Sequence, residues 1–225
     1  GGRLDATNVL DTVLASVITT VDLDHQQFLG DTLGDIAKEK AGIIKSGGLT
    51  LIGPQKKDGE KSISDKVRRE KAKAIYYGSD WHIDRNLDNK TITYSDRDGV
   101  LTLPLPKLRG FHQVLNTGLA IATLRAQNQF HIPDAAIKAG IGWVHWPARM
   151  QQLVDTPLNA RLPKGSSLWL DGGHNPAAAK TLKNTVVSMT SAGHPVRLIL
   201  GMMGTKDIEG FLRPLAGLAT EVIAV

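Results

Sequence analysis

Four short segments hold side chains that could bind an anion, a metal ion or a nucleotide, and two of them lie near the start of the chain. Residues 1–8 read Gly-Gly-Arg-Leu-Asp-Ala-Thr-Asn, so Arg, Asp and Asn follow two glycines. This set can bind an anionic or hydrogen-bonding ligand near the backbone, and a polar loop before a strand has the same composition. Asp24-His25 follows an apolar run. Histidine is the commonest metal ligand, although a lone histidine is also often structural.

The other two segments surround Lys40 and Asp171. Lys40 lies in Lys-Glu-Lys-Ala-Gly at 38–42, and on a helix such a lysine is normally a solvated surface residue. Residues 171–176 read Asp-Gly-Gly-His-Asn-Pro and follow a predicted buried strand. The two glycines permit a tight turn, Pro176 suits the first position of a helix, and helix N-termini attract anions. This segment predicts a phosphate or nucleotide site, with a purely structural turn as the alternative.

The elements that must position these side chains alternate between strands and helices in the first half of the chain. The apolar, β-branched run Thr12–Val21 predicts a strand of a parallel sheet. A cluster after its carboxyl end is well placed for chemistry, because open α/β sheets bind ligands there. Further predicted elements are a helix over 31–44 with Asp31 or Thr32 as N-cap, a strand over 49–53 and a helix over 64–76. This alternation predicts an α/β fold with a mostly parallel sheet.

Three short β-branched or aromatic runs, 81–83, 91–94 and 100–103, predict a small antiparallel patch, and helices are expected over 111–129 and 134–141. After Trp146-Pro147-Ala148-Arg149 a second strand–loop–helix series begins. Its predicted members are strands 167–170, 196–200 and 220–225, and a helix from Ala177 to about Ser188. We therefore expect two domains, at 1–147 and 148–225. The chain starts without Met and ends on an apolar strand, so we expect an internal piece of a longer protein.

Composition narrows the classes of function. The 225 residues include no cysteine, which excludes disulfide frameworks, thiolate zinc sites and cysteine nucleophiles. No apolar run approaches the roughly 18 residues of a membrane span, and no signal peptide is recognisable, so a cytoplasmic protein without a membrane partner is expected. The net charge is +5, yet the Lys-rich stretch 56–73 is interspersed with acids and lacks aromatic platforms. We expect no nucleic-acid partner.

Taken in order, these segments resemble the folylpolyglutamate synthase and dihydrofolate synthase family, within the Mur ligase superfamily. The matching stretches are 1–8, Leu23-Asp24-His25 with 29–32, 38–45, 171–176 and, as a later loop, 201–207. The resemblance implies a Mur-ligase-like central domain in 1–147 and part of a Rossmann-like domain in 148–225. It also implies an enzyme that uses ATP to activate the carboxylate of a reduced folate as an acyl phosphate, which the amino group of L-glutamate then attacks.

The resemblance further implies roles for single residues. His25 matches a Mg²⁺ ligand and Lys40 a carbamylated lysine, and both are therefore expected in catalysis. A carbamate turns a cation into an anion, which suits a site beside Mg²⁺ and phosphates, and its formation needs a neutral amine. ATP-binding residues are expected at Asn116, Arg149 and Asp171, with His174 and Asn175 shaping the same pocket. Folate contacts are expected at Arg3, Leu4 and Asp5.

One departure from the family pattern concerns the phosphate-binding loop. No G-x-x-x-x-G-K-[ST] pattern occurs in the 225 residues, and a metal-binding glutamate expected before the Gly-Gly-Arg motif is also missing. We therefore expect the chain alone to be inactive, and the resemblance suggests a monomer. Two alternatives stay open: a nucleotide- or folate-binding module without catalysis, and a cell-wall Mur ligase. Whether dihydropteroate is also a substrate is left open.

Overall fold

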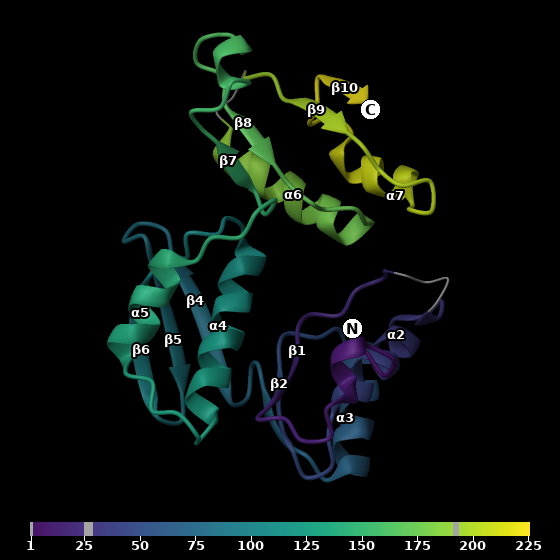
Figure 1. Cartoon of the computed structure of the whole chain (residues 1–225), viewed down its shortest axis with the longest axis vertical. Coiled ribbons are helices and arrows are strands. Elements are labelled where there is room, and N and C mark those ends of the chain that lie inside the picture. The colour runs from purple at the N-terminus through teal and green to yellow at the C-terminus, as the bar shows by residue number, and fades with distance from the viewer. Residues whose placement is uncertain (1, 25–28, 191–193) are drawn as a thin grey trace. The chain divides into compact units, whose positions relative to one another are not determined.

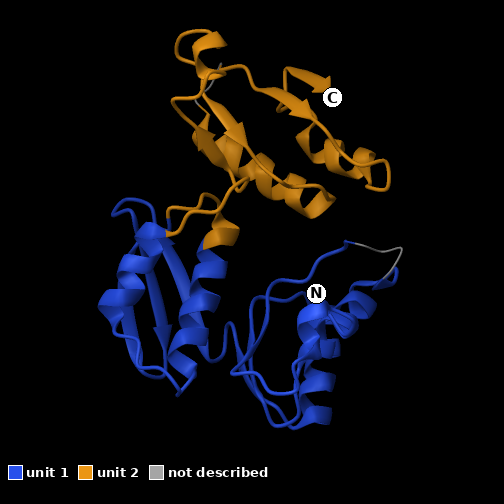
Figure 2. Ribbon diagram, in the orientation of Figure 1, with its two compact units in different colours: residues 1–106, 114–143 blue, residues 107–113, 144–225 orange. Residues whose placement is uncertain are grey.

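The computed structural model describes residues 2–24, 29–190 and 194–225 (Figure 1). The chain divides into two compact units (Figure 2), the first formed by 1–106 and 114–143, the second by 107–113 and 144–225. The break after Trp143 lies slightly before the expected domain boundary. That the two units are the ATP-binding and Rossmann-like domains of the resembled family stays a prediction.

A parallel sheet organises the N-terminal part of the first unit (Figure 1). Its strands are β1 (Ser16–Ile18), β2 (Leu49–Ile52) and β3 (Lys73–Tyr76), in that order, with Val17 beside Leu51 and Leu51 beside Ile75. Helices α2 (Leu33–Lys40) and α3 (Lys57–Glu70) join the strands. Their core consists of Ile18, Val21, Ile36, Ala37, Ala41, Ile44, Ile52 and Ile63. The predicted strand–helix alternation is confirmed, and Thr32 is the N-cap of α2.

The expected helix over 64–76 is wrong at both ends. Helix α3 begins earlier and ends at Glu70, because Lys71 adopts the left-handed conformation with φ 50°. The next residues then form β3, whose Ile75 pairs with Leu51. Lysine and alanine favour a helix locally, but the edge of the parallel sheet offers backbone partners that the helix does not.

The predicted antiparallel patch is confirmed as β4 (Trp81–Asn86), β5 (Thr91–Asp96) and β6 (Gly99–Pro104). Its inward side chains pack with α4 (Phe111–Ala126) and α5 (Asp134–Trp143) in one core. Gly118 on α4 permits this approach, since a Cβ there would lie 2.6 Å from the Trp81 ring. The core comprises Leu51, Trp81, Ile83, Ile92, Tyr94, Leu103, Val114, Leu119, Ile121, Ala122, Ile137 and Ile141.

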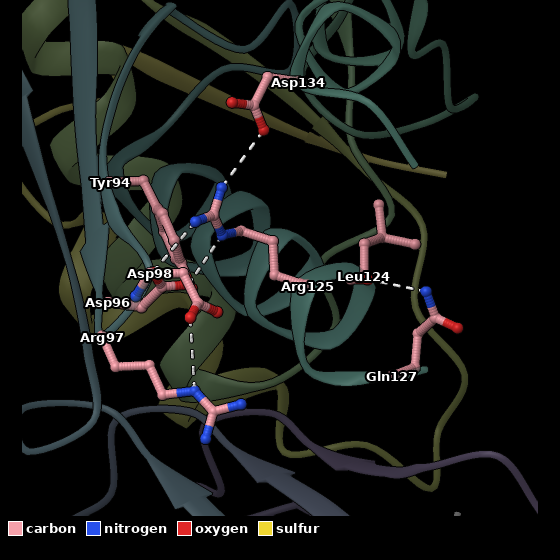
Figure 3. Close-up of polar contacts among 8 residues, drawn as sticks. All are labelled: Tyr94, Asp96, Arg97, Asp98, Leu124, Arg125, Gln127 and Asp134. Atoms are coloured by element: carbon pink, nitrogen blue, oxygen red, sulfur yellow. Dashed lines mark hydrogen bonds and ion pairs between the residues drawn. The ribbon is translucent and has the colours of Figure 1, made fainter. Parts of the chain in front are cut away.

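A network of hydrogen bonds and ion pairs joins the antiparallel sheet β4–β6 to α4 and α5 (Figure 3). Arg125 of α4 donates from Nε to Asp96 Oδ2 at 2.9 Å and from Nη2 to Asp96 Oδ1 at 3.3 Å. Its Nη1 donates to Asp134 at 3.2 Å, and the Tyr94 hydroxyl donates to Asp96 Oδ2 at 2.9 Å. The Arg125 and Asp96 side chains are only 16% and 11% exposed. Burial, followed by the Asp96 contact, raises the pKa of Tyr94.

The second unit contains two small sheets. Strands β7 (Gln151–Leu153) and β8 (Leu168–Leu170) are antiparallel, whereas β9 (Arg197–Leu200) and β10 (Glu221–Ala224) are parallel. Helices α6 (Pro176–Met189) and α7 (Ile208–Leu212) surround a core of Ala179, Phe211 and Leu215. The predicted elements are all present, and β7 is an addition. Short 3₁₀ helices occur at Ala6–Val9, Ala41–Ile43, Asn159–Arg161 and Arg213–Leu215. None of the helices in the described part of the chain could cross a membrane.

Candidate functional site

The loop 171–175 joins β8 to α6 as the sequence predicts. Asn175 is the N-cap of α6, and its Oδ1 accepts a hydrogen bond from the Ala178 N–H at 2.8 Å. Pro176 occupies the first helical turn, where its missing N–H costs nothing. The fourteen-residue helix thus presents its positive N-terminal end beside the loop.

Asp171 organises this loop through both of its carboxylate oxygens. Oδ1 accepts from the Gly173 N–H and Oδ2 from the Met150 N–H, each at 2.8 Å. The first bond closes the glycine turn, and the second joins the loop to a segment 21 residues earlier in the chain. His174 is exposed, with its Nδ1 3.0 Å from the Gly172 carbonyl oxygen. Each carboxylate oxygen can accept more than one hydrogen bond, so Asp171 can still receive a ligand hydroxyl.

Arg149 projects from a strained turn that contacts the same loop. Its neighbours Ala148 and Met150 have φ angles of 54° and 44°, in the left-handed region that side chains disfavour. The Ala148 carbonyl accepts from the Gly172 N–H at 2.8 Å, while the Ala148 N–H donates to Gln151 Oε1 at 3.0 Å. Arg149 is exposed and forms no ion pair with any carboxylate of the described residues. The turn therefore presents a cation that is available to an anion.

A third residue near Asp171 and Arg149 is His112, which the sequence analysis did not identify as part of this site. Residues 107–113 belong to the second unit, and the Arg109 guanidinium lies 4.9 Å from the Trp169 ring centroid. Burial lowers the pKa of His112, while the nearby Asp171 opposes this shift and Arg149 adds to it. Its Nδ1 is buried without a hydrogen-bond partner among the described residues. The only local signal is Gly110, which has a φ of 104° and at which a Cβ would lie 2.6 Å from the His112 ring.

In the first unit the structure brings the Gly-Gly-Arg segment onto the segment that contains Lys40. The Arg3 N–H donates to the Glu39 carbonyl at 2.9 Å, and a Cβ on Gly42 would lie 2.5 Å from Arg3 Cβ. Asn8 Nδ2 donates to the Arg3 carbonyl at 2.9 Å, and Lys45 Nζ donates to the Asn8 carbonyl at 3.1 Å. Lys40, half-buried, is the last residue of α2. Two segments that look independent in sequence are therefore one structural cluster.

The side chains of Leu4 and Asp5 lie at the surface of this cluster. Asp5 caps the 3₁₀ helix at Ala6–Val9, where Oδ1 accepts from the Thr7 hydroxyl at 2.5 Å and from the Thr7 N–H at 2.9 Å. These bonds lower the pKa of the Asp5 carboxyl. Leu4 is 81% exposed, which leaves its side chain free for an apolar contact with a ligand.

The structure thus gathers Arg149, Asp171, His174 and Asn175 in the second unit, and Arg3, Leu4, Asp5 and Lys40 in the first. Asn116 is exposed on α4, in the first unit. The predicted metal ligand His25 lies outside the described residues. Within the described ranges no group of three or more His, Asp or Glu side chains comes together to hold a metal ion. The roles of all these residues, and the Mg²⁺ site, stay predictions.

The chain has the predicted α/β fold, with parallel and antiparallel sheets, and it fits a Mur-ligase-like domain. No protein-family model matches the chain. Folylpolyglutamate synthase of Lacticaseibacillus casei is 33% identical over 214 residues, and dihydrofolate synthase/folylpolyglutamate synthase of Escherichia coli is 32% identical over 213. These alignments cover 92% and 94% of this chain but 47% and 46% of the relatives. A solved structure of E. coli FolC with DHPP and ADP matches with a TM-score of 0.84 and 31% identity, over 99% of this chain and 49% of that one.

The chain therefore belongs to the folylpolyglutamate synthase and dihydrofolate synthase family. It spans about half the length of the curated relatives that it matches.

Proposed function

We propose that the protein carrying this chain ligates L-glutamate to the γ-carboxylate of reduced folates in an ATP-dependent reaction. The observation that carries the proposal is the exposed Arg149 guanidinium, which forms no ion pair with a carboxylate of the described residues and lies on a strained turn that is hydrogen-bonded to the 171–175 loop. A preorganised cation of this kind stabilises the charge that develops when a phosphoryl group is transferred. Family membership and the ADP bound in the matching FolC structure support ATP as the nucleotide.

In the proposed reaction the folate carboxylate attacks the γ-phosphorus of ATP, and the bond to the bridging oxygen breaks to release ADP. The glutamate amine then attacks the acyl phosphate, loses a proton and expels inorganic phosphate. Arg149 would bind phosphate oxygens, and Asp171 would accept hydrogen bonds from the ribose hydroxyls. His174 and Asn175 would shape the same pocket, and Asn116 would contribute a further contact to ATP.

The cluster in the first unit would serve the folate side of the reaction. Arg3, Leu4 and Asp5 supply a cation, an apolar side chain and an anion within three consecutive residues. Lys40, as a carbamate, and His25 would help to hold Mg²⁺, which supplies charge neutralisation at the phosphates when bound. We also propose a monomer in the cytoplasm that binds only small molecules. Dihydropteroate stays open as an additional substrate.

A second candidate function is a nucleotide- or folate-binding module without catalysis. A G-x-x-x-x-G-K-[ST] loop elsewhere in the protein that carries this chain would count against this alternative, because such a loop cradles phosphates with its backbone amides and supplies a lysine to them. A cell-wall Mur ligase is the third alternative, because the fold alone does not select the acceptor.

One assay separates these functions. ADP release by the full-length protein that carries this chain is measured with reduced folate, with and without L-glutamate, and with a muramyl nucleotide instead of folate. The proposal predicts release that requires both folate and glutamate, and Arg149→Ala should reduce it strongly whereas Arg97→Ala, an exposed arginine of the β5–β6 turn, should not. Binding without turnover would establish the non-catalytic module. Turnover with the muramyl nucleotide alone would establish the cell-wall ligase.

A further inference from the structure

The Ala148 carbonyl oxygen accepts two hydrogen bonds that together place the Arg149 guanidinium. One comes from the Gly172 N–H at 2.8 Å, and the other comes from Arg149 itself, whose Nη1 lies 3.1 Å from this oxygen. The guanidinium is therefore folded back over the backbone of Gly172. This leaves the remaining N–H groups of Arg149 for a ligand, since a guanidinium carries five donors.

The guanidinium occupies the space in which a side chain at position 172 would lie. A Cβ on Gly172 would be 2.9 Å from Arg149 Nη1, 3.4 Å from the Ala148 carbonyl oxygen and 3.8 Å from Ala148 Cβ. The backbone of Gly172 does not require glycine, because it is not among the residues with positive φ. Glycine at position 172 therefore leaves room for the Arg149 guanidinium and does not serve a backbone conformation that only glycine adopts.

The backbone around Arg149 is held more firmly than its side chain. Asp171 Oδ2 accepts from the Met150 N–H, and Gln151 Oε1 accepts from the Ala148 N–H, so both sides of the turn are fixed. Arg149 is exposed, so its guanidinium has room to move. A methyl group at position 172 would thus displace the guanidinium and leave the turn in place.

We propose that Gly172 is a positioning residue for Arg149, whose guanidinium it admits to the Ala148 carbonyl and thereby aims at the nucleotide phosphates. The inference rests on the proposed function for its last step, the binding of phosphate. Gly173 differs from Gly172, since a Cβ there would meet Asp171 Oδ1 at 2.9 Å and Ala178 Cβ at 3.1 Å. Substitution of Gly173 therefore disturbs the loop itself, whereas substitution of Gly172 disturbs the exposed Arg149 side chain.

The first test needs no nucleotide and uses the full-length protein that carries this chain. Arg149 is labelled with phenylglyoxal in the wild type, in Gly172→Ala and in the matched control Gly142→Ala, and the rate is followed by peptide mass spectrometry. A Cβ on Gly142 has no heavy atom within 4 Å, so the control adds the same methyl group in open space. Release of the guanidinium from the Ala148 carbonyl should speed labelling about threefold in Gly172→Ala only. An unchanged rate, or loss of the folded state in Gly172→Ala, would overturn the proposal.

The second test is a double-mutant cycle on ADP affinity in the full-length protein that carries this chain. Gly172→Ala should weaken binding about tenfold, which corresponds to one misplaced charge-assisted hydrogen bond. In the Arg149→Ala background the same substitution should change the affinity less than about twofold, because the group through which it acts is gone. Additive losses would show that Gly172 does not affect ADP affinity through Arg149.

The two tests separate the failure of this inference from failure of the proposed function. If Arg149→Ala leaves ADP affinity unchanged, the phosphate-binding role of Arg149 is wrong, and the labelling rates still decide whether Gly172 places the guanidinium. If labelling responds as expected and the affinities are additive, Gly172 places the guanidinium but not for ADP.

Discussion

Replacement of Asp96 by Asn should destabilise the first unit, because Asp96 is the acceptor on which the network of Figure 3 converges. Its two oxygens accept from the Tyr94 hydroxyl, from Arg125 Nε and Nη2, and from the Asp98 N–H. Asparagine has nearly the same shape but replaces one of these oxygens with an NH₂ donor. Two of the four bonds are then lost in either orientation of the amide, and Arg125 loses the charge of its buried partner.

The magnitude follows from the burial of the pair. Breaking a fully buried ion pair by removal of one charge costs about 3–5 kcal/mol. The Arg125 and Asp96 side chains retain 16% and 11% exposure, and Arg125 keeps its contact with Asp134 at 3.2 Å. We therefore expect a loss of about 2–4 kcal/mol after discounting for solvent screening. For a chain of this size each kcal/mol corresponds to roughly 2–4 °C, so the thermal midpoint should fall by about 5–15 °C.

Thermal and urea unfolding, followed by circular dichroism, measure this loss. The matched control is Arg97→Gln on the neighbouring turn, where Arg97 Nε lies 3.7 Å from Asp98 Oδ1 and the two side chains are 85% and 53% exposed. Such an exposed pair contributes less than about 1 kcal/mol. If Asp96→Asn unfolds within the range of this control, the network does not hold the sheet to α4, and the reasoning from burial is refuted.

Three further predictions concern the second unit and Lys40. His112 has a lowered pKa in the folded chain, so the unfolded state takes up its proton first as the pH falls. The wild type should therefore lose more stability than His112→Gln between about pH 7.5 and pH 5.5. Equal losses in the two proteins would contradict the assigned burial of His112. Asn175→Ala removes the N-cap of α6 and should cost about 1 kcal/mol in urea unfolding, and no change in the unfolding midpoint would contradict this capping role. Lys40→Ala should abolish ADP release by the full-length protein, and added short carboxylates should restore part of this activity. Lys38→Ala, on the exposed face of α2, should leave ADP release unchanged. Full activity of Lys40→Ala without added carboxylate would mean that no carbamate is needed.

Local patterns determined most of the elements around the candidate site. Short β-branched or aromatic runs predicted strands β4 to β6, and Pro176 predicted where α6 begins, because the fixed φ of proline acts within one turn of the chain. The motifs also indicated the family from sequence alone. The prediction of a helix over 64–76 was wrong at its end because a strand at the edge of a parallel sheet is stabilised by partners distant in sequence. Ile75, for example, pairs with Leu51.

Tertiary structure alone decided how the candidate residues are held. The bond from Met150 to Asp171 joins two segments that no local pattern connects, and so does the contact of Arg3 with Gly42. Likewise, a glycine motif in the sequence indicates only that the backbone can adopt a tight turn or be approached closely, because glycine has no side chain. In the structure the Arg149 guanidinium lies where a side chain at position 172 would be, with Nη1 2.9 Å from the place of a Cβ, and this relation joins groups that are far apart along the chain. The sequence shows which side chains can do chemistry, whereas their positions relative to one another depend on the folded backbone.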